Sequence, residues 1–384
     1  MIISRRSFLQ YAGEGMLLLG GLSFLNSCSG VKRDDLLALV DKKESTKGFE
    51  KDELEILYLA SLAPSGHNTQ PWIVKIVEPK HWVIGSDKKR WLTAVDPNNR
   101  ELLLGIGAFI ENLALAAGTF GYEVDVQLIT KNPSDLDIAD IRFKKGNTTE
   151  FPLEKIKKRR TLRTDYLTQE IKTEDLKYIT KHEAKSCTLS NVPSPHSFYF
   201  SNTSPQGKYL QEGTIEANRK QAFRDPAQEE LANWIRWSNK EAKQYRNGLT
   251  PESMEIKGIA GLFVRNFYDR ESVLKKSFRD QTVDIVAKQV KTCGGWLVVT
   301  SHDSNIPTLI EYGRVFENMF LRIREKMIAI HPMTQMLEEE PWKKQVSKEL
   351  GLNGEVQWIL RVGYLKSYPD PVSLRMPVSW FVQA

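Results

Sequence analysis

The spacing of apolar residues predicts a chain of alternating helices and strands. Residues 52–62 carry apolar side chains at positions 54, 57, 58 and 62, which places them on one face of a helix. Short apolar runs bounded by turn-forming residues are typical of buried strands. They occur at 72–77, 82–86, 122–129, 138–144 and 296–299. This mixture of helices and strands predicts an α+β protein, arranged as an α/β sandwich.

A second helix is predicted at residues 100–120, and it is apolar on nearly every side. A helix of that kind has to be buried on most of its faces. Gly121 follows it, at the position where a glycine often ends a helix. We therefore expect a long buried helix that ends near Phe120.

Part of the first half of the chain is repeated in the second. Residues 107–115 and 313–321 share the pattern G-x-x-apolar-E-N-apolar-x-L, and each copy follows a strand and leads into a long helix. One short match can arise by coincidence, but its order and spacing favour duplication. We expect two fused halves at 49–150 and 151–384, the second carrying a helical, aromatic insert at about 205–290.

Composition excludes several classes of protein. The chain has 384 residues, a net charge of +6, six histidines and three cysteines, with no CxxC motif. Neither a metal cluster nor a disulfide framework is indicated, although a single bond between Cys187 and Cys293 is an alternative to two buried thiols. The basic run at 157–163 is short and lacks interleaved aromatic residues, so it does not predict nucleic-acid binding. The sequence also lacks a G-x-G-x-x-G motif after a strand, which argues against a Rossmann domain.

The amino terminus resembles an export signal. Residues 4–9, Ser-Arg-Arg-Ser-Phe-Leu, resemble the twin-arginine motif, and the apolar run at 16–25 is far too short to span a bilayer. The four residues ending in Cys28 resemble a bacterial lipobox. We expect export to the periplasm or to the outer side of the membrane, with membrane contact only through the signal or a lipid anchor. The predicted segments are a signal at 1–28 and a polar linker at 29–48.

The most distinctive stretch, residues 63–72, lies between the first helix and the first strand and reads Ala-Pro-Ser-Gly-His-Asn-Thr-Gln-Pro-Trp. Ser65, Asn68 and Gln70 can each donate and accept hydrogen bonds, which suits the edge of a heteroaromatic ring. The simpler interpretation is a turn that ends the helix at Pro64. The string resembles, at every fixed position, the P-S-x-x-N-x-Q-P-W signature of the nitroreductase family of flavin enzymes, especially its FMN-binding Acg-type branch.

The resemblance implies an FMN site assembled from four segments. A doubly charged phosphate needs several cationic donors, and arginine supplies them with bidentate geometry. Residues 159–163 resemble the R-R-S-x-R phosphate motif of the family, although alone they could be the solvated end of a helix at 153–160. The loop after the second long helix and a C-terminal arginine occupy places that contact the flavin pyrimidine and phosphate in the family. The residues expected to bind FMN are Pro64, Ser65, Gly66, Asn68, Gln70, Arg159, Arg160, Thr161, Arg163, Pro332, Thr334, Gln335 and Arg375.

Proteins of this family are normally homodimers with FMN bound between the subunits, so two fused halves would form a pseudo-dimer within one chain. The signature loop lies in the first half and the other three segments lie in the second. Neither half contains the motifs that a mirror-image site would need. We therefore expect one FMN per chain, in a monomer or weak dimer.

The resemblance implies an FMN-dependent oxidoreductase that transfers a hydride or electrons to a flat acceptor such as a quinone or a nitroaromatic compound. No catalytic side chain is identifiable, because transfer at a flavin needs stacking geometry more than a proton donor. The expected electron donor is NAD(P)H or, outside the cytoplasm, a membrane quinol or a protein. The alternative is a non-catalytic protein that binds or sequesters FMN, in which the insert forms a lid.

Overall fold

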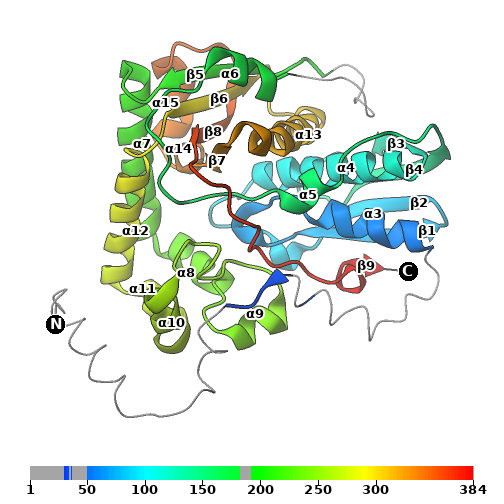
Figure 1. Ribbon diagram of the computed structural model, residues 1–384, viewed down its shortest axis with the longest axis horizontal. Coiled ribbons are helices and arrows are strands. Elements are labelled where there is room, and N and C mark those ends of the chain that lie inside the picture. Colours follow the sequence, from blue (N-terminus) through cyan, green and yellow to red (C-terminus); the bar gives the residue numbers. More distant parts are fainter. Residues whose placement is uncertain (1–29, 34–35, 37–49, 182–191, 384) are drawn as a thin grey trace.

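The computed structural model describes residues 30–33, 36, 50–181 and 192–383. The predicted export signal, with Cys28, and the second cysteine, Cys187, lie outside the described residues. Two sheets and a set of helices form an α+β architecture, which confirms the predicted fold class (Figure 1).

The first sheet has five strands in the order β3-β4-β2-β1-β9. Neighbours within it are antiparallel except β1 and β9, which run parallel with Val74 opposite Val382. The four strands predicted in the first half are confirmed to within one or two residues. Their bounds, with those of the C-terminal strand, are β1 Trp72–Glu78, β2 His81–Ser86, β3 Tyr122–Leu128, β4 Asp137–Lys145 and β9 Val382–Gln383.

The second sheet has four antiparallel strands in the order β5-β6-β8-β7. Strand β6 is buried along its whole length, as its continuous apolar run predicts. The bounds are β5 His196–Ser201, β6 Gly295–Ser301, β7 Ile328–Pro332 and β8 Glu355–Tyr364.

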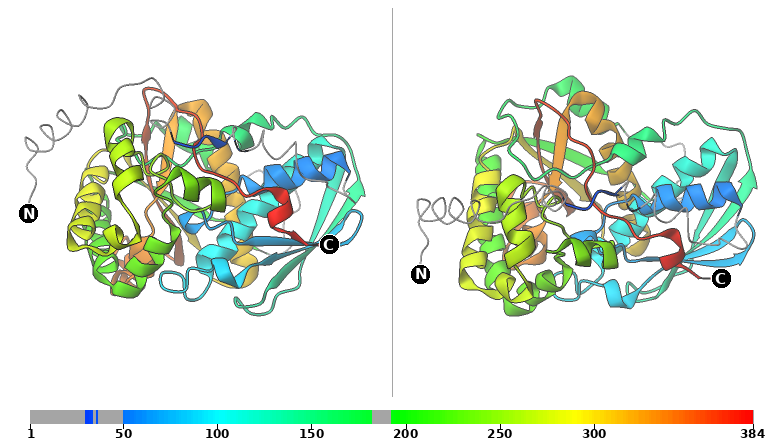
Figure 2. Two further views of the ribbon diagram at one scale, coloured as in Figure 1. Left: turned by 90° about the horizontal axis from the view of Figure 1, so that it is seen from below. Right: turned by 60° about the horizontal axis from the view of Figure 1, so that its bottom comes forward.

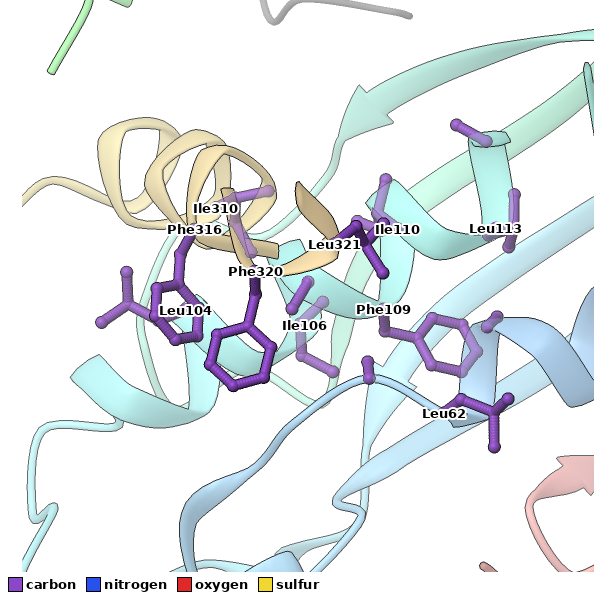
Figure 3. Packing of buried hydrophobic residues seen from close by; sticks show 14 of the residues in the cluster. Leu62, Leu104, Ile106, Phe109, Ile110, Leu113, Ile310, Phe316, Phe320 and Leu321 are labelled. Carbon is purple, nitrogen blue, oxygen red and sulfur yellow. The ribbon is translucent and has the colours of Figure 1, made fainter. Parts of the chain in front are cut away.

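Two long helices, α4 (Arg100–Thr119) and α13 (Ile306–Arg322), pack against each other at the centre of the molecule. Figure 3 shows their apolar side chains interdigitating, with Phe316 and Phe320 of α13 beside Leu104 of α4. Helix α4 is long and apolar enough to cross a bilayer, but 89% of its most apolar stretch is buried. Its bounds agree with the helix predicted at 100–120, and Gly121 adopts the positive φ of 78° expected after a helix end.

The remaining helices cover these layers. The predicted insert at 205–290 is helical throughout most of its length, and Figure 2 shows its helices on the side of the molecule away from the first sheet. The insert helices are α7 Pro205–Phe223, α8 Asp225–Trp234, α9 Asn239–Tyr245, α10 Gly258–Phe267, α11 Arg270–Leu274 and α12 Lys276–Gln289. The others are α3 Lys51–Ser61, α5 Glu154–Lys158, α6 Thr173–Ile179, α14 Gln335–Glu338 and α15 Trp342–Glu349.

The repeated E-N pair of each central helix faces the other helix. Asn318 on α13 donates to the Glu111 carboxylate on α4 at 2.9 Å. In the opposite direction, Asn112 on α4 lies close enough to Glu317 on α13 to favour its ionised form. The glutamate of each copy therefore faces the asparagine of the other copy across the crossing. This arrangement supports the interpretation of 107–115 and 313–321 as related segments.

Two chain ends reach across from one half to the other. The segment after β8 runs back along the molecule and adds β9 to the first sheet, which the predicted division at residue 150 does not anticipate (Figure 1). Leu36, from the predicted linker, is buried against Leu374 of that returning segment. Arg33 of the same linker donates to the Lys157 carbonyl at 2.8 Å. The contact with Leu374 places the linker beside the segment that carries Arg375, which itself donates to Leu62 and Asn68.

Candidate functional site

The signature loop has an unusual backbone. His67, Asn68 and Gln70 have φ values of 46°, 55° and 52°, a region that residues other than glycine rarely adopt. The Ser65 hydroxyl accepts a hydrogen bond from the Gln70 amide at 3.0 Å, which closes the turn. Three such residues within four positions require surrounding contacts that hold them, and such strain clusters at functional sites.

Those contacts come from the two side-chain amides of the loop. Asn68 donates to the carbonyls of Gly248 (3.1 Å) and Leu374 (3.2 Å) and accepts from Arg375 at 2.9 Å. Gln70 is fully buried, donates to the Arg246 carbonyl at 3.0 Å and accepts from the Met376 amide at 2.9 Å. Both amides therefore join the loop to the insert and to the C-terminal segment. The prediction that they contact a cofactor gains no support from these partners.

Two predicted phosphate-binding arginines converge on the end of α3. Arg159 and Arg375 both donate to the Leu62 carbonyl, at 2.8 Å and 3.0 Å. A cation is favoured there because the last carbonyls of a helix carry partial negative charge. Arg159 also lies 3.3 Å from the buried carboxylate of Glu317. Burial, followed by repulsion from Arg159, lowers the pKa of Arg375 well below its ordinary value.

The other two predicted arginines are held by the insert. Arg160 forms an ion pair with Glu255 at 2.8 Å and donates to the Asp370 carbonyl. Arg163 donates to the Ser253 carbonyl at 2.9 Å. The segment that connects α9 to α10 therefore covers this part of the basic motif. Sequence reasoning did not identify Glu255, because its contact with Arg160 spans 95 positions of the chain.

Arg163 also links the signature loop to the end of β7, because it interacts electrostatically with both His67 and His331. Burial lowers the pKa of His67 to about 4, with Arg163 adding to the effect and Glu101 opposing it. Burial, then Arg361 and Arg163, lowers the pKa of His331 well below its ordinary value. Both imidazoles are therefore neutral at pH 7. Sequence reasoning missed both residues, although His67 stands inside the signature and His331 stands beside Pro332.

The predicted pyrimidine-side residues lie at the start of α14. Thr334 donates to the Glu338 carboxylate at 2.8 Å, and Gln335 has a buried side-chain oxygen without a hydrogen-bond partner. Burial, then the charge of Glu101, raises the pKa of Glu338 to about 8. Glu101 also faces Gly66, where a Cβ would stand 3.6 Å from its carboxylate. The loop and the start of α14 therefore approach each other around Glu101.

The remaining predicted residues are Pro64, Pro332 and Thr161. The Pro64 carbonyl faces Gly105 of α4. Pro332 ends β7 and pairs with Leu360, and Thr161 is half-buried.

Cys293 has a free, buried thiol. Within the described ranges, no group of three or more His, Cys, Asp or Glu side chains is placed to hold a metal ion.

The buried arginines retain capacity for an anion. One nitrogen of each guanidinium is buried without a hydrogen-bond partner: Nη1 of Arg159, Nε of Arg160 and Nε of Arg375. An unpaired buried donor costs free energy, so the structure favours an acceptor at these atoms. Arg159 and Arg375 also repel each other, and an added negative charge would offset that repulsion. These residues therefore fit a phosphate group, as the four-segment prediction requires.

The chain is similar to curated proteins named as nitroreductases. It is 40% identical over 87 residues to the Mycobacterium tuberculosis protein acg, which is provisionally named an NAD(P)H nitroreductase. The aligned residues make up 22% of this chain and 25% of that protein. It is 33% identical over 82 residues to PigM of a Serratia species, named a probable NAD(P)H nitroreductase, over 21% and 23%. The chain spans about a quarter of the length of the curated relatives that it matches. No family model matches the chain.

Solved structures similar to this chain include a nitroreductase-like protein from Bacillus cereus, with 12% identity and a TM-score of 0.34 over 62% of this chain and 98% of that one. They also include a Bacteroides fragilis nitroreductase with bound FMN, with 18% identity and a TM-score of 0.32 over 58% and 95%. The local sequence similarity to the curated proteins supports a relationship between this chain and the nitroreductase family.

Proposed function

We propose that this chain binds FMN and acts as an oxidoreductase of the nitroreductase type. The observation that carries the proposal is the meeting of Arg159 and Arg375 at the signature loop, with unpartnered buried nitrogens on both and on Arg160. The local identity to proteins named as nitroreductases agrees with it.

Each part of the site has a distinct role in this proposal. Arg159, Arg160 and Arg375 would hold the phosphate, and Ser65 and Gly66, which precede the strained residues of the loop, would present their backbone to the ring system. Arg163, whose charge acts on two neutral imidazoles, could donate hydrogen bonds to a ring carbonyl. Bound FMN would supply hydride and single-electron transfer, which no side chain of the protein provides.

The proposal includes one FMN per chain in a fused pseudo-dimer. The crossing helices α4 and α13 would correspond to the central helices of the two halves, and only one signature loop is present in the sequence. The acceptor would be a flat molecule such as a quinone or a nitroaromatic compound. The donor would be NAD(P)H, as the names of the relatives suggest, or a membrane quinol or protein if the chain is exported by the twin-arginine route.

The second candidate function is flavin binding without turnover. The insert favours it, because the Gly248 amide donates to the Asn68 carbonyl at 3.0 Å and Glu255 pairs with Arg160. These contacts place the insert directly on the signature loop and on the basic motif. A cover of this kind would restrict access of a donor and an acceptor to the ring.

Spectroscopy of the purified chain distinguishes these functions. A flavin absorption band with one FMN per chain is expected for both. Anaerobic addition of NADH, NADPH or a quinol bleaches the band of an enzyme, and a quinone or nitroaromatic acceptor restores it. A band that no donor bleaches indicates sequestration. A colourless protein that cannot be reconstituted with FMN excludes both, and two FMN per chain excludes the single-site arrangement.

A further inference from the structure

Helix α10 carries three exposed apolar side chains along one side. Ile259, Phe263 and Phe267 follow one another at intervals of four residues and are 62%, 41% and 70% exposed. This spacing places them on one side of the helix. The opposite side carries Val264 and Gly261, which are buried in the insert. The helix is therefore apolar on both its inner and its outer face.

This face is unusual on the described surface. Among the described residues, the other exposed large apolar side chains are spread over other parts of the chain, as Val77 and Ile285 are, and no other described helix contributes three of them. Single exposed apolar residues are ordinary, whereas a contiguous group marks an interaction surface. The rings of Phe263 and Phe267 lie 4.8 Å apart and form its centre.

The amino-terminal part of the chain joins the body beside α10. Gly30 lies directly against the Glu252 carboxylate, which pairs with Arg265 of α10. Val31 then packs against the apolar cluster that holds Leu36. Cys28, the candidate lipidation site, precedes Gly30 by two residues. Two residues of chain span at most about 7 Å, so an anchor at that position would hold the α10 side of the molecule close to a bilayer.

We propose that the outer face of α10 rests on the membrane surface, with Ile259, Phe263 and Phe267 inserted among the lipid headgroups. Interfacial helices bind in this way, with aromatic side chains at the boundary between headgroups and acyl chains. Lys257 directly precedes the helix, and its side chain is 58% exposed, so it can meet anionic headgroups. The inference concerns orientation and does not depend on a bound flavin.

The size of the face favours a membrane over a second copy of the chain. A stable dimer needs about 800 Å² from each partner, which three side chains of one ten-residue helix do not supply. A membrane contact needs less, because a lipid anchor and an apolar patch act together as two signals.

The test compares two double variants of the full chain. Ile259→Ser with Phe267→Ser removes the proposed contact. Val77→Ser with Leu136→Ser removes similarly exposed side chains from β1 and from the residue that precedes β4. Each protein is floated with vesicles of phosphatidylcholine and phosphatidylglycerol, and amide exchange at 258–267 is measured with and without vesicles. A Cys28→Ser chain separates the contribution of the anchor.

The proposal expects vesicles to slow amide exchange at 258–267 and the α10 variant to float about tenfold less well than the control variant. The Cys28→Ser chain should bind more weakly but keep the vesicle-dependent protection. Equal flotation of the two double variants would overturn the proposal. So would protection of 258–267 without vesicles, which would show that another segment covers α10. A vesicle-free dimer that the α10 substitutions abolish would also overturn it, in favour of a second copy.

Discussion

Gly107 and Gly313 meet where α4 crosses α13, and each is packed against the backbone of the other helix. A Cβ on Gly107 would stand 2.0 Å from the Ile310 carbonyl oxygen, and a Cβ on Gly313 would stand 2.0 Å from the Leu104 carbonyl oxygen. The contacts are reciprocal, because each contacted residue lies three positions before the glycine of its own helix. The two copies of the repeat therefore occupy equivalent places at the crossing.

Replacing either glycine should separate the central helices. We expect Gly107→Ala and Gly313→Ala each to lower the free energy of unfolding by at least about 2 kcal/mol, because the added methyl group would overlap a carbonyl oxygen. Gly105→Ala on the same helix is the matched control, since its Cβ would stand 3.5 Å from the Pro64 carbonyl. That control should be neutral or slightly stabilising. Urea denaturation of the three variants measures the difference, and equal stability would contradict the close crossing.

The sequence pattern predicts the strands of the first half, strand β6 and the central helices well because their apolar runs are local. The run at 100–120 is long, uninterrupted and followed by Gly121, so both the burial and the end of α4 could be inferred. The position of β9 could not, because a two-residue strand has no periodicity and its pairing with β1 joins opposite ends of the chain.

The candidate site was predicted in part. Its arginines could be found from their charge and their place in a resembling motif. The hydrogen bonds of the Asn68 and Gln70 side chains could not be predicted, because the carbonyls that accept them lie about 180 or 300 positions away in the chain. The position of His67 within the signature indicates that it belongs to the site. The sequence gives no such indication for Glu255, because its pairing with Arg160 depends on how the insert folds back.

Glu317 should make stability depend on pH. Burial raises its pKa to about 7, while Arg159 and Asn112 partly oppose the shift. Between about pH 4.5 and 7 the folded state binds more protons than the unfolded state, so stability falls as pH rises, by about 3 kcal/mol in total. We expect Glu317→Gln to remove this decline. Urea denaturation between pH 4 and 8 tests the expectation, with the exposed Glu123→Gln as control; an unchanged slope in Glu317→Gln would exclude this source.

The phosphate arginines should control affinity for FMN more than affinity for riboflavin. We expect Arg160→Gln combined with Arg375→Gln to raise the Kd for FMN about 100-fold, because charge-assisted bonds to phosphate are lost. Riboflavin lacks the phosphate, so its affinity should change little. Flavin fluorescence quenching measures both constants.

Arg142→Gln on the first sheet is a suitable control, because Arg142 is half exposed and pairs with Asp140. The thermal unfolding midpoint should be measured beside the affinities, since Arg375 also holds Leu62 and Asn68 in place. Equal losses for FMN and riboflavin would show that the arginines shape the loop rather than bind phosphate.

Glu255 should compete with the phosphate for Arg160. Its carboxylate lies 2.8 Å from the guanidinium, and its backbone has a φ of 63°, which its contacts with Arg160 and Lys257 help to hold. A phosphate that takes Arg160 has to displace this ion pair or share it. Glu255→Gln removes the competing charge, and we expect it to strengthen FMN binding by about five- to tenfold, or about 1 kcal/mol.

Glu252→Gln is the matched control for this prediction, because Glu252 pairs with Arg265 of α10 and not with Arg160. Titration with FMN and with inorganic phosphate should show the gain in Glu255→Gln alone, while riboflavin should show none. Weaker FMN binding in Glu255→Gln would reverse the interpretation, because Glu255 would then orient Arg160 toward the phosphate. Competition would in that case be excluded, and the insert would be part of the cofactor site.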